Sequence, residues 1–263
     1  MRVLRAYPTL LRVGFAGAVA YRAEMLVWML TMTMPLVSLA LWSAVAATAP
    51  VGRFGQREFV GYFLATVVVR QLTGSWVVWE LIQEIKSGAL ATRLLKPIHP
   101  LVVYSADNIA AIPLRTVLAV PMMIIAMASG AGQLPREPLA VAALLLSLSG
   151  AWLITFFVMT AIGTLSFFME SSYSIFEIWL ACFMLLSGYL LPLELFPEWV
   201  RATTYGLPFR YMLSFPVEIL LGLAGPAEIA RGLVVQWIYC LASGLVALVV
   251  WRAGLRRFGA FGG

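Results

Sequence analysis

The segment Glu80–Pro100, ELIQEIKSGALATRLLKPIHP, decides the fold because it is charged in a chain that is otherwise apolar. It contains both lysines of the protein, Lys86 and Lys96, and its single histidine, His99. Long apolar runs flank it, over residues 59–79 and 101–129. A charged segment between hydrophobic runs of that length is expected to connect two membrane spans. We interpret it as a helix and turn outside the membrane that contact a soluble partner.

Composition places the whole chain in a membrane. Of its 263 residues, 62% are hydrophobic and 11% are charged, whereas soluble domains are about half apolar and about a quarter charged. We therefore expect one transmembrane domain over residues 1–263. The net charge of +6 is interpreted as arginines beside spans that meet lipid headgroups, not as a nucleic-acid surface. With one histidine, one aspartate (Asp107) and two cysteines inside apolar runs, no metal site is expected.

The apolar runs predict an all-α polytopic protein with six transmembrane helices, because a span needs about 20 apolar residues. Residues 1–24 are basic and amphipathic, and predict a helix at the membrane interface; a basic leader that only sets the topology is the alternative. The six expected spans are Met25–Ala47, Phe59–Trp79, Leu101–Ser129, Leu139–Leu165, Ile175–Leu191 and Gly232–Trp251.

Lysine and arginine predict the orientation. They are more numerous before the first span, within residues 80–100 and after the last span than in the other connections. The positive-inside rule then places both termini in the cytoplasm. Residues 191–225 contain prolines, charges and apolar residues together, and are expected to form a re-entrant outer segment of short helices between spans five and six.

Motifs for independent catalysis are absent from the sequence. Neither lysine belongs to a G-x-x-x-x-G-K-[ST] phosphate-binding loop, and no G-x-S-x-G or H-E-x-x-H occurs. We therefore expect a transport subunit that is not itself an enzyme and holds no cofactor. A lipid-modifying enzyme or an assembly subunit that uses a carboxylate inside the membrane remains a less favoured alternative.

Charges inside the expected spans are candidates for a transport pathway. Arg70 lies about 16 Å into the second span at 1.5 Å per residue, where a charge costs at least about 2.5 kcal/mol. It is either a substrate contact or part of a buried structural contact. Glu170 and Glu177 are spaced for one helix face and either line a pathway or stabilise a helix start. Arg115 is expected to extend to the membrane surface.

The order of these parts resembles a permease of the type-2 ABC exporter superfamily. The phrase IKSGALATRLLKPIHPL, Ile85–Leu101, is similar to the smaller bacterial six-span permease group. This resemblance implies that two permeases, identical or paralogous, pair in the bacterial cytoplasmic (inner) membrane. It also implies two separate ATPase subunits, which would bind ATP and Mg.

The resemblance also implies roles for individual residues. Residues 80–100 would be the coupling helix, which transmits ATPase movement to the membrane. Its coupling residues would be Glu80, Glu84, Lys86, Gly88, Leu90 and Arg93. A pathway for a hydrophobic or amphiphilic substrate would include Arg70, Glu170, Glu177 and Trp179. The alternative function is an ATP-independent secondary transporter or channel that uses Arg70, Glu170 and Glu177.

Overall fold

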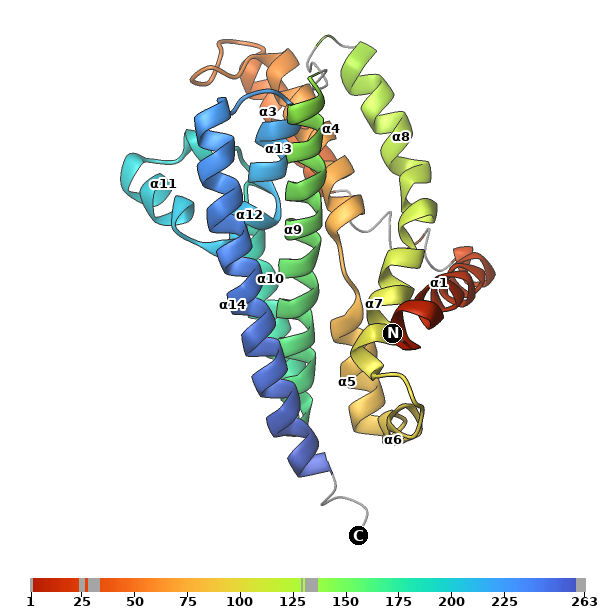
Figure 1. Cartoon of the computed structure of the whole chain (residues 1–263). Coiled ribbons are helices and arrows are strands. Elements are labelled where there is room, and N and C mark those ends of the chain that lie inside the picture. The colour runs from red at the N-terminus through yellow and green to blue at the C-terminus, as the bar shows by residue number, and fades with distance from the viewer. Residues whose placement is uncertain (1, 24–26, 28–33, 129, 131–136, 259–263) are drawn as a thin grey trace.

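The computed structural model is a helical bundle and describes residues 2–23, 27, 34–128, 130 and 137–258. Two short 3-10 turns, η1 (Leu165–Phe167) and η2 (Leu193–Leu195), join its helices (Figure 1). The described part contains no sheet, only an isolated bridge between Val51 and Phe54. The helices are α1 (Arg2–Ala20), α3 (Met34–Ala46), α4 (Gln56–Thr73), α5 (Val77–Ser87), α6 (Leu90–Leu94), α7 (Pro100–Ala110), α8 (Ile112–Ala128), α9 (Pro138–Thr164), α10 (Ser172–Leu186), α11 (Glu198–Tyr205), α12 (Pro208–Met212), α13 (Ser214–Leu220) and α14 (Pro226–Phe258).

Helix α9 is the centre of the bundle. It contacts α4, α5, α10, α12, α13 and α14, and a helix surrounded in this way is expected to be apolar on every side. Its closest neighbour is α14, and Gly150 on α9 leaves room for Gln236 on α14. The Gln236 amide donates to the carbonyl oxygens of Ser147 and Tyr211, at 2.9 and 2.8 Å. One buried side chain therefore joins α14 to both α9 and α12.

The two ends of the bundle differ in construction (Figure 1). At one end, α5, α6 and the last turns of α14 lie together over a core that includes Leu81, Leu90 and Trp251. At the other end, the short helices α11, α12 and α13 lie beside the beginning of α14 and pack on a second core around Phe63 and Phe215. Residues 191–225 contain η2, α11, α12 and α13, and a re-entrant outer segment formed by them stays a prediction.

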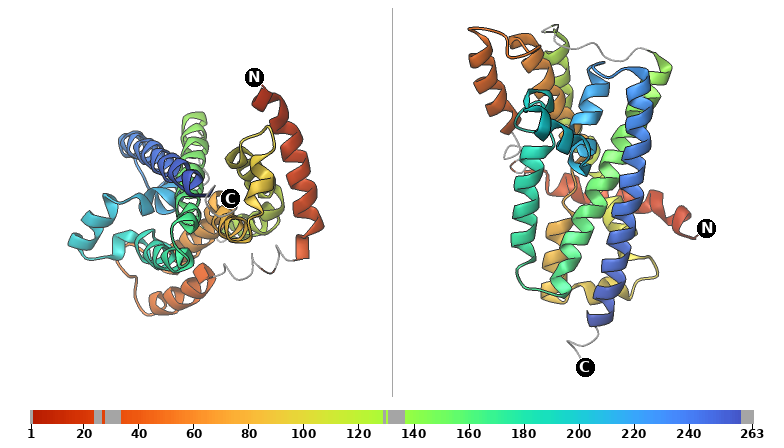
Figure 2. Two further views of the ribbon diagram at one scale, coloured as in Figure 1. Left: turned by 90° about the horizontal axis from the view of Figure 1, so that it is seen from below. Right: turned by 90° about the vertical axis from the view of Figure 1, so that its left-hand side faces the viewer.

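Helix α1 lies crosswise to α9 and α14 (Figure 2). It packs on α7, where the Tyr7 hydroxyl is 3.2 Å from the Ser105 hydroxyl. A Cβ atom on Gly14 would lie 2.8 Å from the Asp107 carboxylate and 3.0 Å from Ala110, so the two helices approach closely at this glycine. A helix is therefore present within residues 1–24, and its location at a membrane interface stays a prediction.

Two described helical segments are long and apolar enough to cross a membrane: Pro138–Phe167 and Pro226–Phe258. A third span results if Pro100–Val117 and Ala119–Ala128, which are bent by 44°, are counted as one. The bend lies one turn before Pro121, whose ring collides with the carbonyl group four residues earlier. The protein is thus an all-helical membrane protein, and the number of six spans stays a prediction.

Several expected spans have different bounds in the structure. The second, Phe59–Trp79, is interrupted between α4 and α5, and the fifth is the shorter helix α10. The sixth is longer than expected, because α14 has 33 residues. Part of the first, Met25–Ala47, lies outside the described residues, and α3 is its described part. Hydropathy alone misses the interruption because residues 74–79 are mostly apolar or small.

Candidate functional site

The interruption between α4 and α5 is the first feature of the candidate site. Helix α4 ends at Thr73, and the chain runs through Gly74, Ser75 and Trp76 before α5 begins at Val77. Figure 1 shows the extended link between the two helices. Irregular backbone at membrane depth needs hydrogen-bond partners from the protein or a wet cavity. Broken helices of this kind often form binding sites in transporters.

Two polar side chains from the neighbouring helices satisfy this interrupted backbone. Arg115 of α8 donates from Nη1 to the Gly74 carbonyl oxygen at 2.7 Å. Asn108 of α7 accepts from the Trp76 amide at 3.0 Å and from the Ser75 hydroxyl at 3.1 Å. The Asn108 amide donates in turn to the Tyr104 carbonyl at 2.9 Å. Two side chains of the third expected span therefore stabilise the interruption through hydrogen bonds.

A cavity of about 250 Å³ lies beside the interruption. Arg70 borders it from the last turn of α4, and Ser75 and Trp76 border it from the link. Glu177 is its one acidic lining residue and is exposed. The remaining lining residues are apolar or aromatic: Met34, Trp79, Met159, Tyr173, Phe176, Leu180, Phe183, Met184 and Tyr189. The cavity therefore combines the Arg70 cation with aromatic walls from the link, from α5 and from α10 with the residues that follow it, while α3 and α9 each add a methionine.

Arg70 is buried, and no acidic partner for it is found among the described residues. Its guanidinium lies 4.8 Å from the ring centroid of Phe183, a cation–π arrangement. Within the described part of the chain, no carboxylate oxygen lies within 4.0 Å of it, and only 9% of the residue is exposed. The buried ion pair considered for Arg70 from the sequence is therefore not found among the described residues.

The charged segment Glu80–Pro100 folds back on itself around Arg93. The Arg93 guanidinium donates to Glu84 and to Glu80, both at 2.8 Å, and lies 4.0 Å from the Asp107 carboxylate. It also lies 4.6 Å from the ring centroid of Tyr104, whose hydroxyl donates to Glu84 at 2.5 Å. We call these five residues the Arg93 cluster. It fastens α6 to α5 and to α7.

Burial changes the acid strength of one member of the Arg93 cluster. Loss of solvent raises the pKa of Glu80 to about 7, although the neighbouring Arg93 cation opposes the rise. Glu80 is thus partly protonated near neutral pH. A neutral Glu80 keeps its hydrogen bond to Arg93 and loses the charge attraction.

The outer surface of the same segment is free for a partner. Leu95 is 87% exposed, and Lys86 and the adjacent Lys96 are exposed as well. Gly88 lies at the turn between α5 and α6 with φ +75°, and a Cβ atom added to it would point into open space. Such a left-handed backbone favours glycine at a helix C-terminus. We call the exposed part of the segment, with Gly88, Leu95 and Lys96, the tip. Its shape depends on the backbone geometry at Gly88 and on the Arg93 cluster.

Replacing Gly88 by valine is expected to loosen the turn, because a left-handed conformation costs a side-chain-bearing residue about 1–2 kcal/mol. Gly88→Asn is the matched control, since asparagine tolerates this conformation. Hydrogen exchange of the amides in residues 86–94 measures the effect. We expect faster exchange in Gly88→Val and near-normal exchange in Gly88→Asn; equal exchange in both variants would contradict the backbone explanation.

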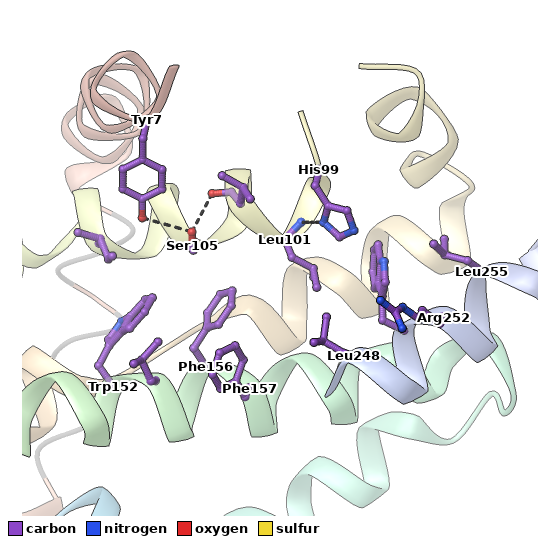
Figure 3. Close-up of a pocket in the computed structure, with 14 residues that line it drawn as sticks. Tyr7, His99, Leu101, Ser105, Trp152, Phe156, Phe157, Leu248, Arg252 and Leu255 are labelled. Carbon is purple, nitrogen blue, oxygen red and sulfur yellow. Dashed lines mark hydrogen bonds between the residues drawn. The ribbon is translucent and has the colours of Figure 1, made fainter. Parts of the chain in front are cut away.

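A second and larger cavity, of about 740 Å³, opens between α1, α7, α9 and α14 (Figure 3). Figure 3 shows Trp152, Phe156 and Phe157 on one wall and Tyr7 and Ser105 on another. His99 and Arg252 lie at one end of it. The lining is mainly apolar, so we regard it as a groove between helices and not as the centre of a polar pathway.

The predicted pathway residues are only partly brought together. Arg70 and Glu177 line the same cavity. Trp179 is not among its lining residues but stacks on Phe183, with ring centroids 5.3 Å apart. Glu170 precedes α10, so it is not on one helix face with Glu177, and its carbonyl oxygen accepts from Lys86 at 2.8 Å. Glu170 therefore belongs to the surroundings of the charged segment.

The predicted coupling residues also have different environments. Leu90 is fully buried in the core of the protein itself, beside Leu81. Glu80, Glu84 and Arg93 bind one another, whereas Lys86 and Gly88 are exposed. Their roles toward a partner stay predictions, and the geometry divides them into residues that shape the segment and residues on its surface.

Sequence reasoning was wrong about Arg115 and missed two supporting residues. Arg115 does not extend to the membrane surface, because only 3% of it is exposed and it binds the Gly74 carbonyl. Asn108 and Tyr104 were not considered as site residues. The signal was the polar run YSADN, Tyr104–Asn108, at the start of an otherwise apolar span.

A family model described as ABC-2 family transporter protein matches residues 19–262, which includes α3 to α14 and leaves most of α1 outside. None of the curated proteins compared with the chain matches it.

Proposed function

Because the chain belongs to the ABC-2 transporter family, we propose that it is one of two permeases of an ATP-driven exporter. The second permease is an identical or paralogous chain. Two separate ATPase subunits bind ATP and Mg and drive the transport cycle, so this chain needs no cofactor of its own. The complex resides in a bacterial inner membrane with both termini of the chain in the cytoplasm.

The proposal is supported mainly by the way residues 80–100 fold and by the side chains that they expose. Their acidic residues bind Arg93 within the segment itself, and this leaves an exposed tip that includes the apolar residue Leu95 next to Lys96. A large exposed apolar side chain beside charges suits a contact with a folded soluble partner. We therefore assign the tip to ATPase docking and the Arg93 cluster to holding the tip in shape.

The substrate pathway in this proposal passes the cavity at the α4–α5 interruption. Its lining comes from the first, second and fifth expected spans, with one residue from α9. Aromatic walls around a cation suit a substrate with an apolar part and a polar head. The permease pair alternates between two conformations that open to opposite sides of the membrane. ATP binding shifts this equilibrium only to the extent that the ATPases bind one conformation more tightly than the other.

Replacing Leu95 by aspartate is expected to reduce ATPase recovery at least tenfold when the tagged chain is purified in gentle detergent. A charge at the centre of an interface that excludes water is strongly unfavourable. Leu139→Asp is the matched control, because Leu139 is 79% exposed in the first turn of α9, and α9 begins at the other end of the bundle (Figure 1). Mass spectrometry of the co-purified proteins gives the amount of ATPase relative to the chain.

If the wild-type chain is purified without any ATPase, the proposal is rejected, and an ATP-independent transporter or channel becomes the favoured function. Equal ATPase recovery with Leu95→Asp and Leu139→Asp would reject the docking surface while keeping the family role. A second permease of similar mass in the wild-type sample identifies a paralogous partner. If no second permease is found and each complex contains two copies of the chain, the permease is a homodimer.

A further inference from the structure

We infer that the cavity at the α4–α5 interruption binds a negatively charged headgroup, a phosphate or carboxylate, of an amphiphilic molecule. The inference deepens the proposed function, on which it rests for naming this ligand a substrate. The binding site itself is argued from two buried arginines, a helix N-terminus and the aromatic walls.

Two buried cations lie next to each other without acidic partners in the described residues. A Cβ atom on Gly74 would lie 3.8 Å from Nη1 of Arg70 and 3.9 Å from Nη1 of Arg115, so both guanidinium groups approach the same point. Nη1 of Arg115 donates to the Gly74 carbonyl oxygen, and Nε of Arg115 is buried without a hydrogen-bond partner among the described residues. Like charges at this separation in a poorly polar environment are unfavourable until an anion joins them.

The interrupted helix adds to the positive potential. Helix α5 begins at Val77, and the residues just before it, Ser75 and Trp76, line the cavity. The N-terminus of a helix carries a partial positive charge and attracts anions. The opposing C-terminus of α4 is neutralised, because Arg115 binds the Gly74 carbonyl and the Gly74 amide donates to the Arg70 carbonyl at 3.0 Å.

The acidic lining residue Glu177 forms no ion pair with Arg70 in the described structure. Glu177 is exposed, and its carboxylate lies more than 4.0 Å from the Arg70 guanidinium, because no ion pair joins them in the described structure. An anionic head beside Arg70 would leave its apolar part against Phe176, Phe183 and their neighbours. The volume of about 250 Å³ suits a headgroup with a short part of its chain.

The test is calorimetric titration of the purified chain in phosphatidylcholine nanodiscs with hexyl phosphate and with hexylammonium, using empty nanodiscs as the blank. We expect hexyl phosphate to bind at least about tenfold more tightly, the ratio expected from one charge-assisted hydrogen bond. A preference for hexylammonium, or equal binding of the two probes, would overturn the inference without any variant. No ATPase is needed, so this result is independent of the purification experiment with Leu95→Asp.

Three variants locate the site. Arg70→Gln is expected to weaken hexyl phosphate binding at least about tenfold, and Glu177→Gln to strengthen it by removing a repulsion. Arg252→Gln, on the rim of the other cavity, is the matched control and should leave it unchanged. Unchanged binding in Arg70→Gln would overturn the inference.

Repeating the titration in nanodiscs that contain phosphatidylglycerol separates two sources of the anion. Competition by this lipid assigns the headgroup to the bilayer. Unaltered binding assigns it to an amphiphile that arrives separately. Both results support anion recognition by Arg70.

Discussion

Replacing Arg210 by alanine is expected to destabilise the protein by about 3–5 kcal/mol, the loss that follows when one partner of a buried ion pair is removed. Arg210 of α12 donates to Glu218 of α13 at 2.7 Å, and 5% and 7% of these two residues are exposed. The same Nη2 donates to Glu228 of α14 at 3.2 Å. Without Arg210, the Glu218 carboxylate is buried and unpaired.

Thermal unfolding of the purified chain in detergent measures this effect. We expect the Tm of Arg210→Ala to fall by about 10 °C, given about 2–4 °C per kcal/mol for a chain of this size. Glu228→Gln is the control within the same cluster: its side chain is 50% exposed, and exposed pairs contribute about 0–1 kcal/mol. Its Tm should stay close to the wild-type value.

A double variant separates the cost of an unpaired charge from a need for the pair itself. Arg210→Met combined with Glu218→Leu removes both charges and fills the space with apolar groups, a change that is often neutral or stabilising. We expect its Tm to recover most of the loss. A double variant as unstable as Arg210→Ala would show that the ion pair specifies how α12 and α13 pack, and would contradict our explanation.

Replacing Arg93 by alanine is expected to release α6 from α5 and reduce ATP-driven transport at least tenfold. The variant leaves Glu80, Glu84 and Asp107 without their shared cation, and these carboxylates then repel one another. Tyr104 also loses the guanidinium above its ring. Arg93→Lys should give an intermediate result, because an ammonium group cannot bind two carboxylates as the guanidinium fork does.

The readout must distinguish a residue that shapes the segment from one that touches the ATPase. Hydrogen exchange of residues 88–97 in the purified chain alone is expected to accelerate in Arg93→Ala. It should stay unchanged in Lys86→Gln, since Lys86 is exposed and its one described bond goes to the Glu170 carbonyl. Loss of transport by Arg93→Ala with unchanged exchange would instead make Arg93 a direct contact.

Glu84, which the resemblance implies to be a coupling residue, also helps to hold the segment in shape. In the structure, Glu84 accepts from Arg93 and from Tyr104. An arginine there would face Arg93, so we expect the local fold of the segment to be lost together with docking.

The sequence by itself determined the class of the protein and the order of its parts. Hydropathy identified α9 and α14 as helices able to span a membrane, because about 20 consecutive apolar residues have few alternatives. The phrase Ile85–Leu101 pointed to the permease family that the comparison then established for residues 19–262. Prolines within residues 191–225 predicted short helices, because each removes a backbone donor.

The place of the interruption in the second span, and the partners that the charged residues bind, follow from tertiary contacts that no sequence pattern reveals. The interruption at Gly74–Trp76 depends on Arg115, 41 residues after Gly74, and on Asn108, 32 residues after Trp76, and neither has a periodic relation to it. Spacing places Glu80, Glu84 and Arg93 on one segment, but contacts turn them toward one another. Hydrophobic periodicity is a local property of the chain, whereas partner choice among buried charges is set by which helices pack side by side.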